Sequence, residues 1–215
     1  MKSLTDYLEE AQVFSSAATS IKGKEVAALV KLYNSGMFRE GGTALDAGAG
    51  KYGRNAEWLR KQGIRTYAYD PFNGTTADGW EAVSTVMPNE KFDTGFTSYV
   101  LNVVPEEVEA QIIRDVEGRV NGTVFHITRG TDVTDMIWRT IQPGGKRNKY
   151  IMEFIEANYP EYMAKIDAGD VTKEDATALA KLGVASAKDS FQRYPDLSKY
   201  GYKRSGSGAS IVWTK

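Results

Sequence analysis

Three glycines, Gly48, Gly50 and Gly53, have the spacing G-x-G-x-x-G. Glycines at such a turn let the backbone approach a ligand that a Cβ atom would exclude. The motif alone is weak evidence, but it follows a short apolar run at residues 43–45 and precedes a helix-like segment. A strand, a glycine loop and a helix in this order indicate a site for a nucleotide-like cofactor.

Two carboxylates flank this loop. Asp70 ends the next candidate strand, roughly 20 residues after the loop, where a carboxylate can accept hydrogen bonds from both ribose hydroxyls. The alternative is a structural glycine turn followed by a helix-breaking Asp70-Pro71 pair. Asp46 lies two residues before the first glycine, where NAD-binding units generally have an apolar residue because their pyrophosphate is negative. A carboxylate there favours a cationic ligand, and a nicotinamide cofactor stays as the alternative.

The D-x-G-x-G form of this loop resembles motif I of the class I S-adenosylmethionine-dependent methyltransferases. Residues 92–106 (FDTGFTSYVLNVVPE) resemble the fourth-strand segment of the same superfamily, and the similar pieces together cover residues 43–129. The resemblance implies S-adenosyl-L-methionine as cofactor and methyl transfer as the activity. It also implies a set of cofactor-binding residues: Asp46, Ala47, Gly48, Gly50, Gly53, Asp70, Pro71 and Tyr99.

A more specific resemblance comes from four short segments. Residues 18–22, 68–72, 98–104 and 190–193 are similar to methyltransferase-like proteins associated with DNA phosphorothioation systems. This similarity supports a second hypothesis, a catalytically silent S-adenosylmethionine-binding module that regulates a partner in DNA modification or phage defence. Neither resemblance names the methyl acceptor, so we expect either a nucleic acid or a small molecule.

Methyl transfer from a sulfonium is an in-line displacement, in which a protein orients donor and acceptor, excludes water and removes a proton where the acceptor needs it. Tyr99 and Asn102 lie at the exit of the fourth candidate strand, where α/β sheets place their ligands, and they are the candidate catalytic residues. His126 is the single histidine, but it lies inside an apolar strand. A hydrogen-bonded structural histidine is therefore favoured over a base.

Strand and helix patterns alternate through residue 129, which predicts an α/β fold with a Rossmann-like, doubly wound, mostly parallel sheet. The fourth strand is expected within residues 92–104, with its core at 96–100. A terminal β-hairpin is expected to pair residues 200–203 with 209–214. We predict one methyltransferase-like domain over residues 1–215, comprising N-terminal helices as a lid (1–40), a cofactor-binding core (43–129), a helical insertion (130–190) and terminal strands (191–215).

Composition narrows the function classes. The 215 residues include 27 Lys+Arg and 28 Asp+Glu, for a formal net charge of -1, so the whole chain has no electrostatic attraction to nucleic acid or to an anionic membrane. The chain has no cysteine, which excludes disulfides and thiolate metal sites. We expect no metal and no membrane span or signal peptide, and hence a cytoplasmic location. The oligomeric state is not predicted.

Overall fold

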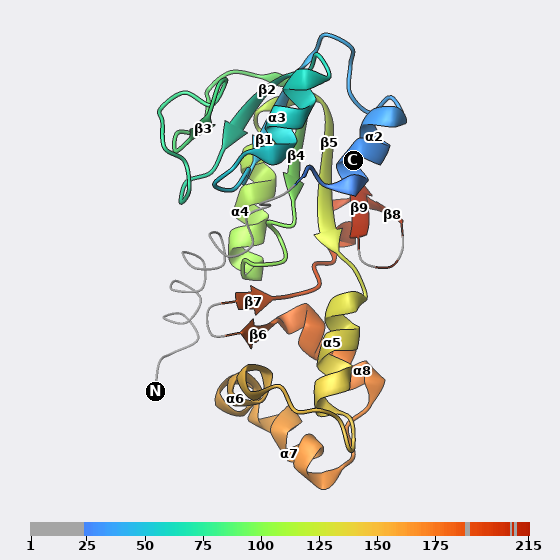
Figure 1. Cartoon of the computed structure of the whole chain (residues 1–215). Helices are drawn as coiled ribbons and strands as arrows, with labels where there is room; N and C mark the ends of the chain where they lie inside the picture. Colours follow the sequence, from blue (N-terminus) through green and yellow to red (C-terminus); the bar gives the residue numbers. More distant parts are fainter. Residues whose placement is uncertain (1–23, 188–189, 207, 209) are drawn as a thin grey trace.

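The computed structural model describes residues 24–187, 190–206, 208 and 210–215 (Figure 1). The segment at 18–22 and most of the predicted N-terminal lid lie outside these residues. One helix of that region is described, α2 (Ala27–Asn34). No helix in the described part of the chain has the length and apolar character needed to cross a membrane.

A seven-stranded sheet forms the centre, in the order β3-β2-β1-β4-β5-β9-β8. The first five strands along the chain are mutually parallel, whereas β9 runs antiparallel to β5 and β8. The predicted Rossmann-like sheet with a C-terminal hairpin is therefore confirmed. The strands are β1 (Thr43–Ala47), β2 (Arg65–Tyr69), β3 (Val83–Ser84), β4 (Phe92–Ser98), β5 (Val120–Arg129), β8 (Lys203–Ser205) and β9 (Ser210–Thr214).

Helices cover both faces of this sheet because neighbouring residues of a strand point to opposite sides. On β1, Ala44 belongs to the apolar cluster that includes α2 and α3 (Arg54–Lys61). The next residue, Leu45, belongs to the cluster on the other face, where α4 (Glu106–Glu117) contributes Ile113 and Val116. The carboxyl ends of the parallel strands are thereby left as the open edge at which a ligand binds.

The segment between β5 and β8 has an apolar cluster of its own, built around residues such as Ile137, Ile151 and Leu179. It contains more than the predicted helices, because Val184–Ala187 (β6) and Ser190–Gln192 (β7) form a separate two-stranded antiparallel sheet. Residues 190–192 therefore pair inside this segment and not with the terminal hairpin. The helices are α5 (Asp132–Ile141), α6 (Lys149–Asn158), α7 (Pro160–Ala168) and α8 (Lys173–Leu182).

Two predicted boundaries are wrong. The fourth strand ends at Ser98, two residues before the predicted end of its core, because Tyr99 has a φ of 62°, which no strand residue adopts. The first strand of the terminal hairpin begins at Lys203, since Leu197–Tyr200 forms a 3-10 turn. The Asp196 side chain accepts a hydrogen bond from the Ser198 N–H and so starts that turn.

Candidate functional site

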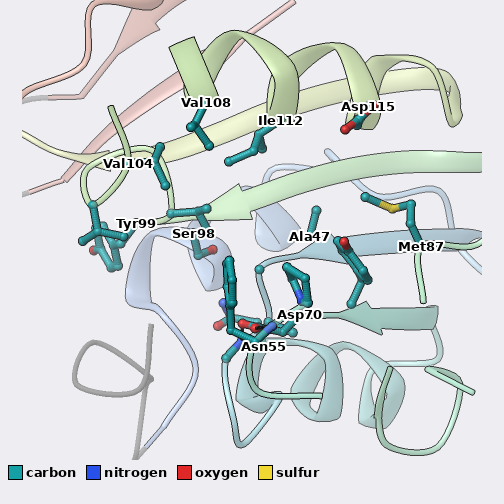
Figure 2. A pocket seen from close by; sticks show the side chains of 18 residues that line it. Ala47, Asn55, Asp70, Met87, Ser98, Tyr99, Val104, Val108, Ile112 and Asp115 are labelled. Carbon is teal, nitrogen blue, oxygen red and sulfur yellow. Dashed lines mark hydrogen bonds between the residues drawn. The ribbon is translucent and has the colours of Figure 1, made fainter. Parts of the chain in front are cut away.

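A pocket of about 280 Å³ opens at the carboxyl ends of β1, β2 and β4, below one face of α4 (Figure 2). This volume is near the lower limit for small-molecule sites, which span roughly 300–1,000 Å³. The lining residues come from the glycine loop, the end of β2, the exit of β4 and the α4 face: Ala47, Gly48, Ala49, Gly50, Asn55, Tyr69, Asp70, Pro71, Phe72, Met87, Ser98, Tyr99, Val100, Val103, Val104, Val108, Ile112 and Asp115.

The glycine loop forms one wall of the pocket. Gly48, Gly50 and Gly53 all have positive φ, at 82°, 66° and 52°, which explains the residue type at each position. A Cβ added to Gly48 would lie 2.3 Å from a methyl group of Val100, so this glycine also permits close contact with the β4 exit. Gly53 precedes the first residue of α3 and lies outside the pocket lining.

The backbone N–H groups of this loop are held by the end of β2. Gly48 and Ala49 both donate to the Tyr69 carbonyl oxygen, at 2.7 and 2.9 Å, and Gly50 donates to Asp70 Oδ2 at 2.9 Å. The other carboxylate oxygen of Asp70 accepts hydrogen bonds from the backbone N–H groups of Phe72 and Asn73. Asp70 lines the pocket and, through these hydrogen bonds, joins the two loops that form it.

Asp46 lies behind the loop and does not line the pocket. It is fully buried, and neither carboxylate oxygen has a hydrogen-bond partner among the described residues. Burial raises the pKa of Asp46 to about 7, and the negative charge of Asp70 also raises it. The Arg60 guanidinium and the Ala56 backbone N–H act in the opposite direction and lower this pKa, although the N–H does not reach hydrogen-bond geometry. Its neighbour Ala47 points to the other side of β1 and does line the pocket.

Tyr99 and Pro71, which the resemblance implies as cofactor-binding residues, also line the pocket. Tyr99 is the one described non-glycine residue with positive φ, and such backbone strain often occurs at functional sites. Its N–H donates to the Ile127 carbonyl at 2.7 Å, and its hydroxyl shares a hydrogen bond with Ser210 Oγ on β9 at 2.7 Å. The strained conformation is thus held from both the backbone and the side chain.

Asn102, predicted as a catalytic residue, lies away from the pocket. It is fully buried, and its amide is used in two structural hydrogen bonds. The Nδ2 group donates to the Arg193 carbonyl at 2.7 Å, and Oδ1 accepts from the Arg129 N–H at 2.8 Å. The residue holds the β4 exit loop against the end of β5, and it is not among the residues that line the pocket.

His126 is a structural residue, as the sequence indicates. It is fully buried between Thr97 Oγ1, 2.9 Å from Nδ1, and Tyr202 Oη, 3.2 Å from Nε2. Tyr202 donates its single hydroxyl proton to Glu117, so His126 Nε2 is the donor to Tyr202 and Nδ1 accepts from Thr97. Burial lowers the pKa of His126 to about 3, which keeps the ring neutral.

Several pocket residues are not among the predicted ones. Val104, Val108 and Ile112 line the pocket at four-residue spacing, so the helical period of the segment could have identified them as one face. Asn55 carries no such signal, because its Oδ1 accepts from the Val26 N–H, 29 residues earlier in the chain. Ser98 has none either, since its position depends on where β4 ends.

No protein-family model matches the sequence, and no curated protein matches it. Solved structures do resemble the fold. The 1,6-didemethyltoxoflavin-N1-methyltransferase of Burkholderia thailandensis, with bound 1,6-didemethyltoxoflavin and S-adenosylhomocysteine, has a TM-score of 0.50 at 12% identity, over 87% of this chain and 76% of that one. Magnesium protoporphyrin IX methyltransferase from Synechocystis PCC 6803, with bound S-adenosylhomocysteine, has a TM-score of 0.49 at 12% identity, over 100% and 87% of the two chains.

These likenesses concern the fold, because the sequence identity is low. The chain has the fold of the class I S-adenosylmethionine-dependent methyltransferases.

Proposed function

We propose that this chain is an S-adenosylmethionine-dependent methyltransferase and that the pocket beside the glycine loop is its donor site. The observation that carries the proposal is the charge of the pocket wall. Among the described residues that line it, Asp70 and Asp115 are carboxylates and none is Lys, Arg or His. Such a wall favours a ligand with positive charge, and S-adenosylmethionine carries a sulfonium and an ammonium.

The glycine loop supports the same choice over a dinucleotide. A pyrophosphate is bound by free backbone N–H groups at the start of a helix. Here the N–H groups of Gly48, Ala49 and Gly50 already donate to Tyr69 and Asp70, and Asp70 places a carboxylate beside them. A pyrophosphate at this position would find these three N–H groups already occupied, and its negative charge would face the Asp70 carboxylate. Both effects favour the methyl donor over NAD.

The residues present fit the proposed ligand in two further respects. Asp70 Oδ2 accepts one hydrogen bond and each carboxylate oxygen has two lone pairs, so it can accept a second from a ribose hydroxyl. The apolar side chains of Val104, Val108 and Ile112 can contact the flat face of a purine. The solved methyltransferase structure from Burkholderia thailandensis, which has a similar fold, contains bound S-adenosylhomocysteine.

When bound, S-adenosylmethionine supplies the methyl group on its sulfonium. The contribution of this chain is to bind and orient the donor, with the glycine loop on one side and the β4 exit on the other, and to exclude water through the apolar α4 face. Tyr99 lies at the β4 exit and lines the pocket, which supports a contact with the reacting groups. The acceptor is a small molecule or a nucleic acid.

Isothermal titration calorimetry tests the donor site. We expect the purified chain to bind S-adenosylmethionine and S-adenosylhomocysteine, and to bind NAD much more weakly. Binding of NAD without binding of S-adenosylhomocysteine would contradict the proposal. The matched variant Ser84→Ala, which alters a buried hydroxyl outside the pocket, should bind like the wild type.

A transfer assay then separates an enzyme from the second candidate, a donor-binding module that regulates a partner. The chain is incubated with methyl-labelled donor and, separately, DNA, RNA, protein and a metabolite extract. Label that appears in one pool identifies the acceptor class. Donor binding with no transfer to any pool would favour the regulatory module, for which the four segments similar to phosphorothioation-associated proteins are the supporting observation.

A further inference from the structure

Ser98, the last residue of β4, has a hydroxyl group that the fold leaves unused. The residue is 8% exposed, and its Oγ has no hydrogen-bond partner among the described residues. It lines the pocket, and in Figure 2 its side chain extends from the end of the strand toward the side where Asn55 and Asp70 lie. A buried hydroxyl without a partner is costly, and most buried polar groups in folded proteins are paired.

The neighbouring residues show that this is a local exception. Thr97 Oγ1 is paired with His126 on the opposite face of the strand, and the Tyr99 hydroxyl is paired with Ser210. Tyr99 also has the strained φ of 62°, which turns the chain directly after Ser98. Both neighbours of Ser98 are therefore held by hydrogen bonds, while the buried Ser98 hydroxyl has no partner among the described residues.

We propose that Ser98 is a ligand-contact residue whose Oγ accepts a hydrogen bond from an N–H group of the bound molecule. The inference rests on the proposed function and adds a residue to it. An N–H partner follows from the surroundings, since Asp70 lines the same pocket and its carboxylate favours positively charged or hydrogen-donating groups. A serine hydroxyl has two acceptor lone pairs that can take such a bond.

Two molecules at this site can supply the N–H group, namely the ammonium of the methyl donor or an amine of the acceptor. Two ligands separate these sources. S-adenosylhomocysteine retains the amino group, whereas its deaminated analogue, 5′-S-(3-carboxypropyl)-5′-thioadenosine, lacks only that group. Calorimetry with both, on the wild type and on Ser98→Ala, measures the coupling between the hydroxyl and the donor amine.

If the donor amine is the partner, Ser98→Ala should bind S-adenosylhomocysteine roughly tenfold more weakly, because a hydrogen bond to a charged group is lost. Binding of the deaminated analogue should not change, and Ser98→Thr should restore the wild-type affinity. If the acceptor amine is the partner, Ser98→Ala should retain donor affinity but transfer label at least tenfold more slowly, again with recovery in Ser98→Thr.

The melting temperature without ligand distinguishes a ligand-contact serine from a structural one, because only the loss of a structural hydroxyl should lower it. Ser98→Ala removes an unpaired hydroxyl, so its melting temperature should equal or exceed that of the wild type. The control Ser84→Ala removes a hydroxyl that pairs with the Val86 N–H and carbonyl, so its melting temperature should fall.

Three results would overturn the inference: a fall in the melting temperature of Ser98→Ala like that of the control, equal weakening of both ligands, or unchanged donor affinity with unchanged transfer. These results are distinct from failure of the proposed function. If the proposed function were wrong, the wild type itself would bind neither S-adenosylmethionine nor S-adenosylhomocysteine. The inference about Ser98 would then be wrong as well.

Discussion

The Asp70 carboxylate accepts a hydrogen bond from the Gly50 N–H at 2.9 Å, so the end of β2 holds the glycine loop in its conformation. The same side chain also accepts the N–H groups of Phe72 and Asn73. A residue that only contacted a ribose could be replaced without loss of stability. Asp70 has a structural role in addition, and this changes what its substitution should do.

We predict that Asp70→Ala lowers both stability and donor affinity. Leaving buried N–H groups unpaired should lower the free energy of unfolding by about 2–4 kcal/mol. S-adenosylhomocysteine should bind at least tenfold more weakly, because the ribose contact and the loop geometry are lost together. Urea unfolding and calorimetry check the two effects. A variant with wild-type stability and weak binding would show that Asp70 acts on the ligand alone.

Asn102→Ala should affect stability and leave donor affinity nearly unchanged. The substitution leaves the buried Arg193 carbonyl and the partly buried Arg129 N–H without their side-chain partner, at a cost of about 2–4 kcal/mol. Urea unfolding measures this loss, and calorimetry with S-adenosylhomocysteine at a temperature where the variant remains folded measures binding. Loss of methyl transfer with unchanged stability would instead support the catalytic role predicted from the sequence.

The pH dependence of stability should contain two opposing contributions. The folded-state pKa of Asp46 is raised from 3.8 to about 7, so its contribution is fully present at low pH and is lost as the pH rises toward 7. The folded-state pKa of His126 is lowered from 6.5 to about 3, so its contribution is present above pH 6.5 and is lost as the pH falls. Each of these two groups contributes about 4–5 kcal/mol to the free energy of unfolding over its full titration range.

These contributions should largely cancel between about pH 4 and 6.5, and single substitutions should reveal them. Asp46→Asn should give a free energy of unfolding that increases with pH, by up to about 1.4 kcal/mol per pH unit. His126→Gln should give the opposite slope. Urea unfolding at a series of pH values measures both. Parallel curves for Asp46→Asn and the wild type would show that the pKa of Asp46 is not raised.

The sequence was sufficient to predict the sheet and the glycine loop, because both depend on local pattern. The local pattern has three parts that lie within about 30 residues of one another. They are a short apolar run, glycines that require positive φ and an acidic residue after the next strand. Asp70 and Pro71, which the family resemblance implies as cofactor-binding residues, both line the pocket. The terminal hairpin was predicted for the same reason, from a turn-rich segment between two β-rich runs.

Side-chain direction at the strand ends could not be predicted with the same means. Asp46 and Ala47 are adjacent, and which of them faces the pocket depends on which side of β1 is covered by α4. Asn102 lies close to Tyr99 in the sequence, but its amide is used by residues 27 and 91 positions further along the chain. Such long-range contacts leave no local signal, and a polar residue near a strand exit can be structural or functional.

Asn102 also determines how the chain is organised between β5 and the terminal hairpin. Its side chain bonds Arg129 and Arg193, and its carbonyl accepts the Arg193 N–H at 2.8 Å. The helical segment and the β6–β7 pair thus leave the sheet and return to it within the reach of a single residue. Ends this close cost little chain entropy to join by a short linker. The segment is arranged as an insert that could be exchanged as a unit while the strand order of the sheet is retained.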